Sequence, residues 1–328
     1  MMLRAQMRMA WVMGLVLAVV SAAGWPAAVL AQDEAAPADG DAVVVKADAQ
    51  GKGVMGLSES EAPLDLQMDF QQMVHYWKIA KFDLARKFAQ AVVQANPEPT
   101  LLLRLVEHPE VGYVLMSQMA GAEDTELAEV ARRLLATTDE GIMIKRKDVD
   151  RMLEALKALD TNERSYQINL RKLQLSGEYA VPPALGLLAE ASEAALHDDI
   201  LRALKDIDRP VVYPLVVALE TTDKDLKLKI IDLLGKLGYK MALPALKAQI
   251  ESADQPEDVK KAAAAAMTAI DGPAALQKSA AQLYGELAEA LYYNKITTVS
   301  DPKRPTTDVW GWSAETRLTY RPAPTEVV

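Results

Sequence analysis

The sequence contains no cysteine, and this absence excludes disulfide bonds, thiolate metal sites and cysteine nucleophiles. Histidine occurs only as His75, His108 and His197, and no two of them lie at the spacing of metal ligands on one element. Aromatic residues make up 5% of the chain, whereas alanine and leucine are abundant. This balance favours close-packed helices over a β-sandwich, in which β-branched and aromatic residues dominate.

Basic residues are outnumbered by acidic ones, and the formal net charge is −10. Proteins that bind nucleic acid usually carry a basic footprint, so we expect no nucleic-acid partner. Apolar residues make up 50% of the 328 residues, which is enough to build a sizeable core. The length suits either two or three ordinary domains or one extended solenoid.

The N-terminal residues have the pattern of an export signal. Arg4 and Arg8 precede an uncharged, largely apolar stretch over 9–31, and Val29 and Ala31 occupy the positions that signal peptidase reads. We predict a signal peptide over 1–31, cleavage that leaves Gln32 as the new N-terminus, and a periplasmic or secreted protein. The alternative is an uncleaved segment that anchors the chain in the inner membrane with the rest facing outward.

Two regions follow before the repeats. Residues 32–64 are rich in Ala, Asp, Glu and Gly, and we predict a disordered acidic linker because such a segment buries too little apolar surface. Helical periodicity begins near Leu66, which predicts an N-terminal helical region over 65–146. Within it, the segment 81–97 resembles the second helix of a tetratricopeptide repeat, with a plain helical hairpin as the alternative.

Internal repeats are the strongest signal in the chain. Pro183, Pro214 and Pro244 are 31 and 30 residues apart, and each lies six residues after a turn residue. These turn residues are Gly177, Asp208 and Gly238. A residue that ends one helix in a left-handed turn, followed by a proline in the first turn of the next helix, predicts a repeated helical pair.

The second helix of each pair opens with a related motif, seen in Asp225-Leu226-Lys227 and Asp258-Val259-Lys260 and more weakly in Leu196-His197. The combined pattern resembles the HEAT-repeat family, well over 179–272 and loosely over 147–177. The resemblance implies an all-α, right-handed α-α superhelix with HEAT-like repeats over 147–272. It does not imply a particular function, because HEAT arrays bind many different partners.

In a HEAT array the second helices line the concave face, so the resemblance also suggests a partner-binding row. That row consists of His197, Lys227, Lys229 and Lys260. A basic strip on an acidic body would steer an acidic partner or a polyanionic glycan toward the groove. The alternative is that the lysines only pair with aspartates around the turns and that His197 makes a polar contact between repeats.

The C-terminal residues change in character. We predict a capping helix over 273–297 and an aromatic β-hairpin tail over 298–328, with its strands within 308–321. Trp310, Trp312 and Tyr320 form a candidate aromatic strip for stacking on a sugar or peptide; the alternative is that they cap the open end of the solenoid. The layout resembles exported bacterial HEAT-repeat proteins in which more chain follows, which leaves open whether Val328 is the true C-terminus.

Two short motifs match sites of chemistry by letter only. Gly51-Lys52-Gly53-Val54-Met55-Gly56 has the dinucleotide-binding spacing, but no strand–turn–helix unit surrounds it. Ser300-Asp301-Pro302-Lys303 has the spacing of a Ser-x-x-Lys pair, but Pro302 prevents the helical turn that would stack the two side chains. We therefore assign no catalytic, cofactor-binding or metal-binding residue and expect no cofactor.

The sequence thus predicts an exported, non-catalytic HEAT-repeat scaffold that binds a protein partner, and a membrane only if the N-terminal segment stays uncleaved. Two alternatives remain. One is an accessory subunit of an exported enzyme, and the other is a lyase of the HEAT-like bilin-lyase type, whose pigment substrates are cytoplasmic.

Overall fold

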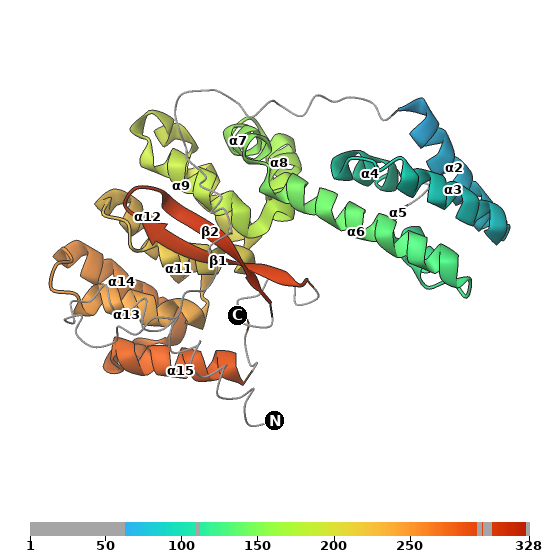
Figure 1. The fold of residues 1–328 in the computed structure, drawn as a ribbon. Coiled ribbons are helices and arrows are strands. Elements are labelled where there is room, and N and C mark those ends of the chain that lie inside the picture. The colour runs from blue at the N-terminus through green and yellow to red at the C-terminus, as the bar shows by residue number, and fades with distance from the viewer. Residues whose placement is uncertain (1–62, 109–111, 294–296, 298–303, 326–328) are drawn as a thin grey trace. The chain divides into compact units, whose positions relative to one another are not determined.

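The computed structural model describes residues 63–328 apart from 109–111, 294–296, 298–303 and 326–328 (Figure 1). The predicted signal peptide, the linker up to residue 62, the Gly51–Gly56 motif and the Ser300–Lys303 motif lie outside the described residues. The described residues divide into two compact units, and the boundary lies between Asp148 and Val149. None of the helices in this described part is both long and apolar enough to cross a membrane.

The described residues of the first unit form five helices and the turns between them. The helices are α2 (Leu64–Lys78), α3 (Phe82–Gln94), α4 (Pro99–Val106), α5 (Gly112–Ala120) and α6 (Thr125–Lys147). A short turn joins α2 to α3, so the two helices form a hairpin. Asp124 is the N-cap residue just before α6, and its carboxylate accepts a hydrogen bond from the backbone N–H of Leu127 at 3.0 Å. This side-chain cap satisfies one of the N–H groups that the first turn of a helix leaves unpaired.

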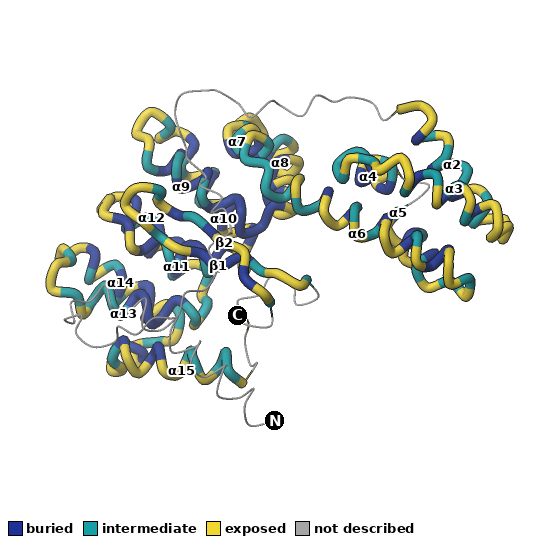
Figure 2. The backbone as a smooth tube through the Cα atoms, viewed as in Figure 1, coloured by how far each residue is buried: buried dark blue, intermediate teal, exposed yellow. Residues whose placement is uncertain are grey.

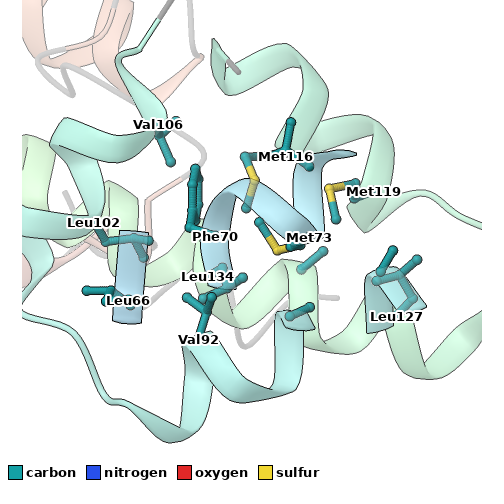
Figure 3. Close-up of a cluster of buried hydrophobic side chains, with 14 residues drawn as sticks. Leu66, Phe70, Met73, Val92, Leu102, Val106, Met116, Met119, Leu127 and Leu134 are labelled. Carbon is teal, nitrogen blue, oxygen red and sulfur yellow. The ribbon is translucent and has the colours of Figure 1, made fainter. Parts of the chain in front are cut away.

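The core of the first unit lies where the apolar faces of its helices meet. Figure 3 shows Phe70 and Met73 of α2 among side chains from α3, α5 and α6, including Val92, Met116 and Leu134. All five of these side chains are at most 2% exposed. The helical spacing read from the sequence is therefore the spacing of a buried face, and α2 begins at Leu64, close to the expected Leu66.

The second unit is an array of helix pairs followed by a hairpin of two strands. Its helices are α7 (Val149–Lys157), α8 (Glu163–Ser176), α9 (Val181–Ala189), α10 (His197–Ile207), α11 (Val212–Ala218), α12 (Lys224–Leu237), α13 (Leu243–Glu251), α14 (Glu257–Asp271) and α15 (Ala280–Tyr292). Its strands are β1 (Thr306–Ser313) and β2 (Arg317–Pro324). Short 3₁₀ turns precede several of the first helices, among them η2 (Gly177–Ala180) before α9 and η4 (Arg209–Val211) before α11.

The predicted turn residues end the second helices. Gly177, Asp208 and Gly238 follow α8, α10 and α12 with φ of 61°, 69° and 77°. Positive φ stops the helical hydrogen-bond ladder and is easiest for glycine, whereas Asp208 is a non-glycine exception. The fold prediction of an all-helical solenoid with a small C-terminal β-hairpin is confirmed.

Consecutive helix pairs pack closely. A Cβ added at Gly235 of α12 would lie 3.1 Å from the Cα of Ala266 in α14, so a glycine allows the two second helices to approach each other. Leu234 beside it is fully buried. Figure 2 shows that buried residues concentrate in the middle of the array, where α10 and α11 lie beside the hairpin.

The C-terminal strands form an antiparallel hairpin that is slightly longer than expected. Trp310 pairs with Tyr320 and Trp312 pairs with Leu318, so these four side chains share one face. Both strands pack against α11, and the hairpin therefore crosses the inner repeats (Figure 1). It is not a cap on the last helix of the array, which was the alternative suggested by the sequence.

Candidate protein-binding surfaces

The residues of the predicted partner-binding row make contacts between repeats. Lys229 in α12 donates from Nζ to the Leu188 carbonyl and to His197 Nδ1, each at 2.9 Å. An ammonium group can only donate, so His197 Nδ1 accepts and its Nε2 carries the hydrogen. Nε2 lies 3.1 Å from the Leu187 carbonyl oxygen and 3.2 Å from that of Glu190. This histidine therefore links the end of α9 to α12.

Lys227 is a buried residue of the same row. It is 6% exposed, and its Nζ donates to Gln255 Oε1 at 3.1 Å, across the turn that precedes α14. Burial lowers the pKa of the Lys227 ammonium group, because removing a charge from water disfavours the charged form. Lys260 is half-buried. The four predicted residues thus do not form one exposed basic strip.

Aspartates near the row pair with other lysines. Lys224 forms an ion pair with Asp258, and Lys236 pairs with Asp232 at 2.8 Å. Both lysines are well exposed, so each pair contributes little to stability. The second helices α12 and α14 consequently present a surface of mixed charge.

The predicted aromatic strip is largely internal. Trp310 is 4% exposed and Tyr320 is 7% exposed, and their ring centroids are 5.0 Å apart in an edge-to-face arrangement. Both rings also pack against Tyr179 of η2, at 6.1 and 5.3 Å. Trp312 on the same face is half-buried. Of the three aromatic side chains, only Trp312 is therefore not fully buried.

A buried polar network fixes the hairpin to the array. Trp310 Nε1 donates to Glu178 Oε2 at 3.1 Å, and the Tyr179 hydroxyl donates to Asp308 Oδ2. Glu178 and Asp308 are at most 8% exposed, so both carboxylates require such donors. Burial also raises the pKa of Tyr320 to about 12, because the phenolate form is disfavoured away from water.

One exposed helix face was not singled out from the sequence. Arg164, Ile168, Arg171 and Leu175 follow one another at steps of four, three and four residues, so they share one face of α8. Ile168 is 49% exposed and Leu175 is 40% exposed, and both arginines are exposed. Lys172, also exposed, lies at the edge of this face. We call these five residues the α8 face.

The opposite side of α8 is held in the array. Tyr166 is 1% exposed, and its hydroxyl donates to Asp206 Oδ2 of α10 at 2.7 Å. The Arg202 guanidinium of α10 lies 4.0 Å from the centre of the Tyr166 ring and pairs with Glu163. Burial and the neighbouring carboxylate of Asp206 raise the pKa of Tyr166. These contacts fix which face of α8 points outward.

Among the described residues, no group of three or more His, Asp and Glu side chains is placed to hold a metal ion. Histidines 75, 108 and 197 lie on separate elements, α2, the residues after α4, and α10.

Comparison with known proteins supports the repeat assignment. Residues 212–278 match the family model of HEAT repeats, a span that runs from α11 through α14. This match and the paired helices confirm the resemblance drawn from the proline and turn spacing. No curated protein matches the chain significantly. The helix pairs α7–α8 and α9–α10 precede the matched span.

Proposed function

Because this chain contains HEAT repeats, we propose that it is an exported, non-catalytic scaffold that binds other proteins through its repeat array. HEAT repeats stack so that each pair contacts its neighbours, and the outer faces of successive helices then form one extended surface. Such surfaces serve mainly protein–protein contacts. The observation that carries the proposal is the continuous series of helix pairs from α7 to α14.

The contacts between repeats support a surface that is organised before a partner arrives. Lys229, His197 and the carbonyl groups at the end of α9 join two adjacent repeats, and Lys227 joins α12 to the turn before α14. A rigid surface loses little conformational entropy on binding, so more of the contact energy appears as affinity. These polar side chains hold neighbouring repeats together. We therefore expect a partner to contact other, exposed positions of the second helices.

The export part of the proposal rests on the N-terminal sequence. A basic start, an uncharged stretch over 9–31 and a cleavage pattern ending at Ala31 are typical of a signal peptide. Export to the periplasm or the medium would place the array where it meets exported proteins. An uncleaved segment would instead tether the same array to the outer face of the inner membrane.

Site-specific photo-cross-linking in the native host tests both parts. A photoreactive amino acid is placed at Lys205 of α10 or at Lys236 of α12, both exposed on second helices, and at Lys240, in the turn before α13, as the matched control. We expect discrete protein adducts from the first two positions only, on a chain that begins at Gln32 and fractionates with exported proteins. Equal adducts at all three positions would refute binding through the array. A full-length chain in the cytoplasm would refute export.

A further inference from the structure

We propose that the α8 face binds an acidic amphipathic helix of a protein partner. This inference rests on the scaffold function proposed above and adds the chemistry of the partner. Three observations carry it: the charges on the α8 face have no partner within the described chain, exposed apolar residues lie between them, and the face is fixed in orientation.

The charges are the first observation. Arg164, Arg171 and Lys172 make no ion pair or side-chain hydrogen bond with any described residue. On neighbouring second helices, by contrast, Arg202 pairs with Glu163 and Lys236 pairs with Asp232. The whole chain has a net charge of −10, so a cluster of unpaired positive charges stands out from its surroundings. Such a cluster steers a negatively charged partner toward this face.

The apolar residues are the second observation. Ile168 and Leu175 are two turns of helix apart, and Arg171 lies between them on the same face. A ligand that was only acidic would leave both side chains in water. A helix with apolar residues at intervals of three, four and seven would bury them and place carboxylates against the flanking cations. The 14 residues of α8 extend about 21 Å, which matches a partner helix of about four turns.

The fixed orientation is the third observation. Tyr166 lies on the buried side of α8 and is bonded to Asp206, while Arg202 covers its ring. The α8 face is therefore held outward by contacts that a partner does not have to form. A basic helix that binds membranes usually inserts a continuous apolar face between lipid headgroups. Here the larger apolar side of α8 is already buried against the array, which favours a protein partner over a lipid surface.

Fluorescence anisotropy with a designed peptide tests the proposal on the mature full-length protein. The probe is a labelled helical peptide of about 18 residues, with leucine at helical spacing and glutamate elsewhere. Two control peptides replace every leucine by serine or every glutamate by lysine. We expect the acidic amphipathic peptide to bind and both controls to bind at least about tenfold more weakly. Its affinity should also fall as the ionic strength is raised from about 0.05 to 0.5 M.

Matched variants locate the site. The triple change Arg164→Glu, Arg171→Glu and Lys172→Glu should weaken peptide binding at least about tenfold. The control triple change, Lys240→Glu, Lys261→Glu and Lys278→Glu, alters the net charge equally at exposed positions outside α8 and outside the two positions expected to cross-link, and should change binding less than about twofold. A second variant, Ile168→Ser with Leu175→Ser, should weaken binding without changing the slope of affinity against salt. Far-UV circular dichroism confirms that each variant is folded.

Several results would overturn the proposal. Equal losses in the two charge-reversed variants would indicate attraction to the whole surface, and tight binding of the serine peptide would remove the role of the apolar residues. Sedimentation with phosphatidylglycerol vesicles that depends on Arg164 and Arg171, without peptide binding, would identify a lipid-binding surface. If cross-linked partners persist in the α8 triple variant, the scaffold function stands and the α8 face is wrong. If the unaltered protein gives no cross-linked partner at all, the scaffold function is rejected as well.

Discussion

Replacing Trp310 by alanine removes the largest buried side chain that the hairpin contributes to its interface with the repeats. The indole is 4% exposed, packs on Tyr179 and Tyr320, and donates a hydrogen bond to the buried Glu178. A buried aromatic side chain covers roughly 150–250 Å², which corresponds to about 4–6 kcal/mol at 25 cal/mol per Å². Measured Trp→Ala changes in cores cost about 3–5 kcal/mol. We therefore expect the free energy of unfolding of the second unit to fall by about 4 kcal/mol.

Trp312 provides a matched control on the same strand and the same face. It is only half-buried, so Trp312→Ala should cost less than Trp310→Ala, about 1–2 kcal/mol. Guanidinium titrations followed by far-UV circular dichroism compare the two variants, and hydrogen exchange of residues 306–324 shows whether the hairpin detaches locally. Equal destabilisation by the two changes, or unchanged protection of the hairpin in Trp310→Ala, would show that the hairpin is not held through the Trp310 side.

Four further substitutions test the packing and the burial of one charged group. Leu234→Asp places a carboxylate at a fully buried position and should destabilise the array by at least about 3 kcal/mol; an unchanged thermal transition would contradict the packing of α12. A Cβ at Gly141 would lie 2.3 Å from the Pro99 carbonyl oxygen, so Gly141→Ala should cost about 1–3 kcal/mol. At Gly285, where an added Cβ meets no other atom within 4 Å, alanine should instead stabilise the protein by up to about 1 kcal/mol. If chemical denaturation shows the same effect for Gly141→Ala and Gly285→Ala, the contact between α4 and α6 is refuted. Burial lowers the pKa of Lys227 below 10.5, so the unfolded chain binds its proton more tightly. Lys227→Met should be the more stable protein at pH 7, and its advantage should shrink as the pH rises toward 10.5; a constant difference would argue against a buried ammonium group.

The sequence determined the features that depend on neighbouring residues. Pro183 and Pro214, each six residues after a turn residue, located the helix pairs because proline fits the start of a helix and a positive φ ends the one before. The alternating aromatics around Ser313–Thr316 likewise indicated the hairpin, since strand alternation and a polar turn are local properties. The acidic balance of the chain is a matter of composition alone.

Tertiary structure decided which of these residues meet solvent. Lys227 follows the opening Asp225 as Lys260 follows Asp258, yet Lys227 is buried against the next repeat and Lys260 is only half-buried. Likewise, Trp310 and Trp312 have equivalent positions in the alternation, but only Trp310 lies over η2. Such differences come from contacts with residues distant in the sequence, which no local pattern specifies.

The α8 face shows the same difference between what the local sequence pattern specifies and what tertiary packing specifies. Its helix carries Ile168 and Leu175 on one side and Leu170 and Leu173 on the other, so the apolar pattern alone does not define one buried stripe. Tyr166 determines which side of α8 is buried. It lies on the same side as Leu170 and Leu173, and its hydroxyl donates a hydrogen bond to Asp206 in the following repeat. Once that side is buried against α10, the unpaired arginines are left facing outward. Sequence thus determined that a helix forms here, and packing between repeats decided which of its faces a partner can reach.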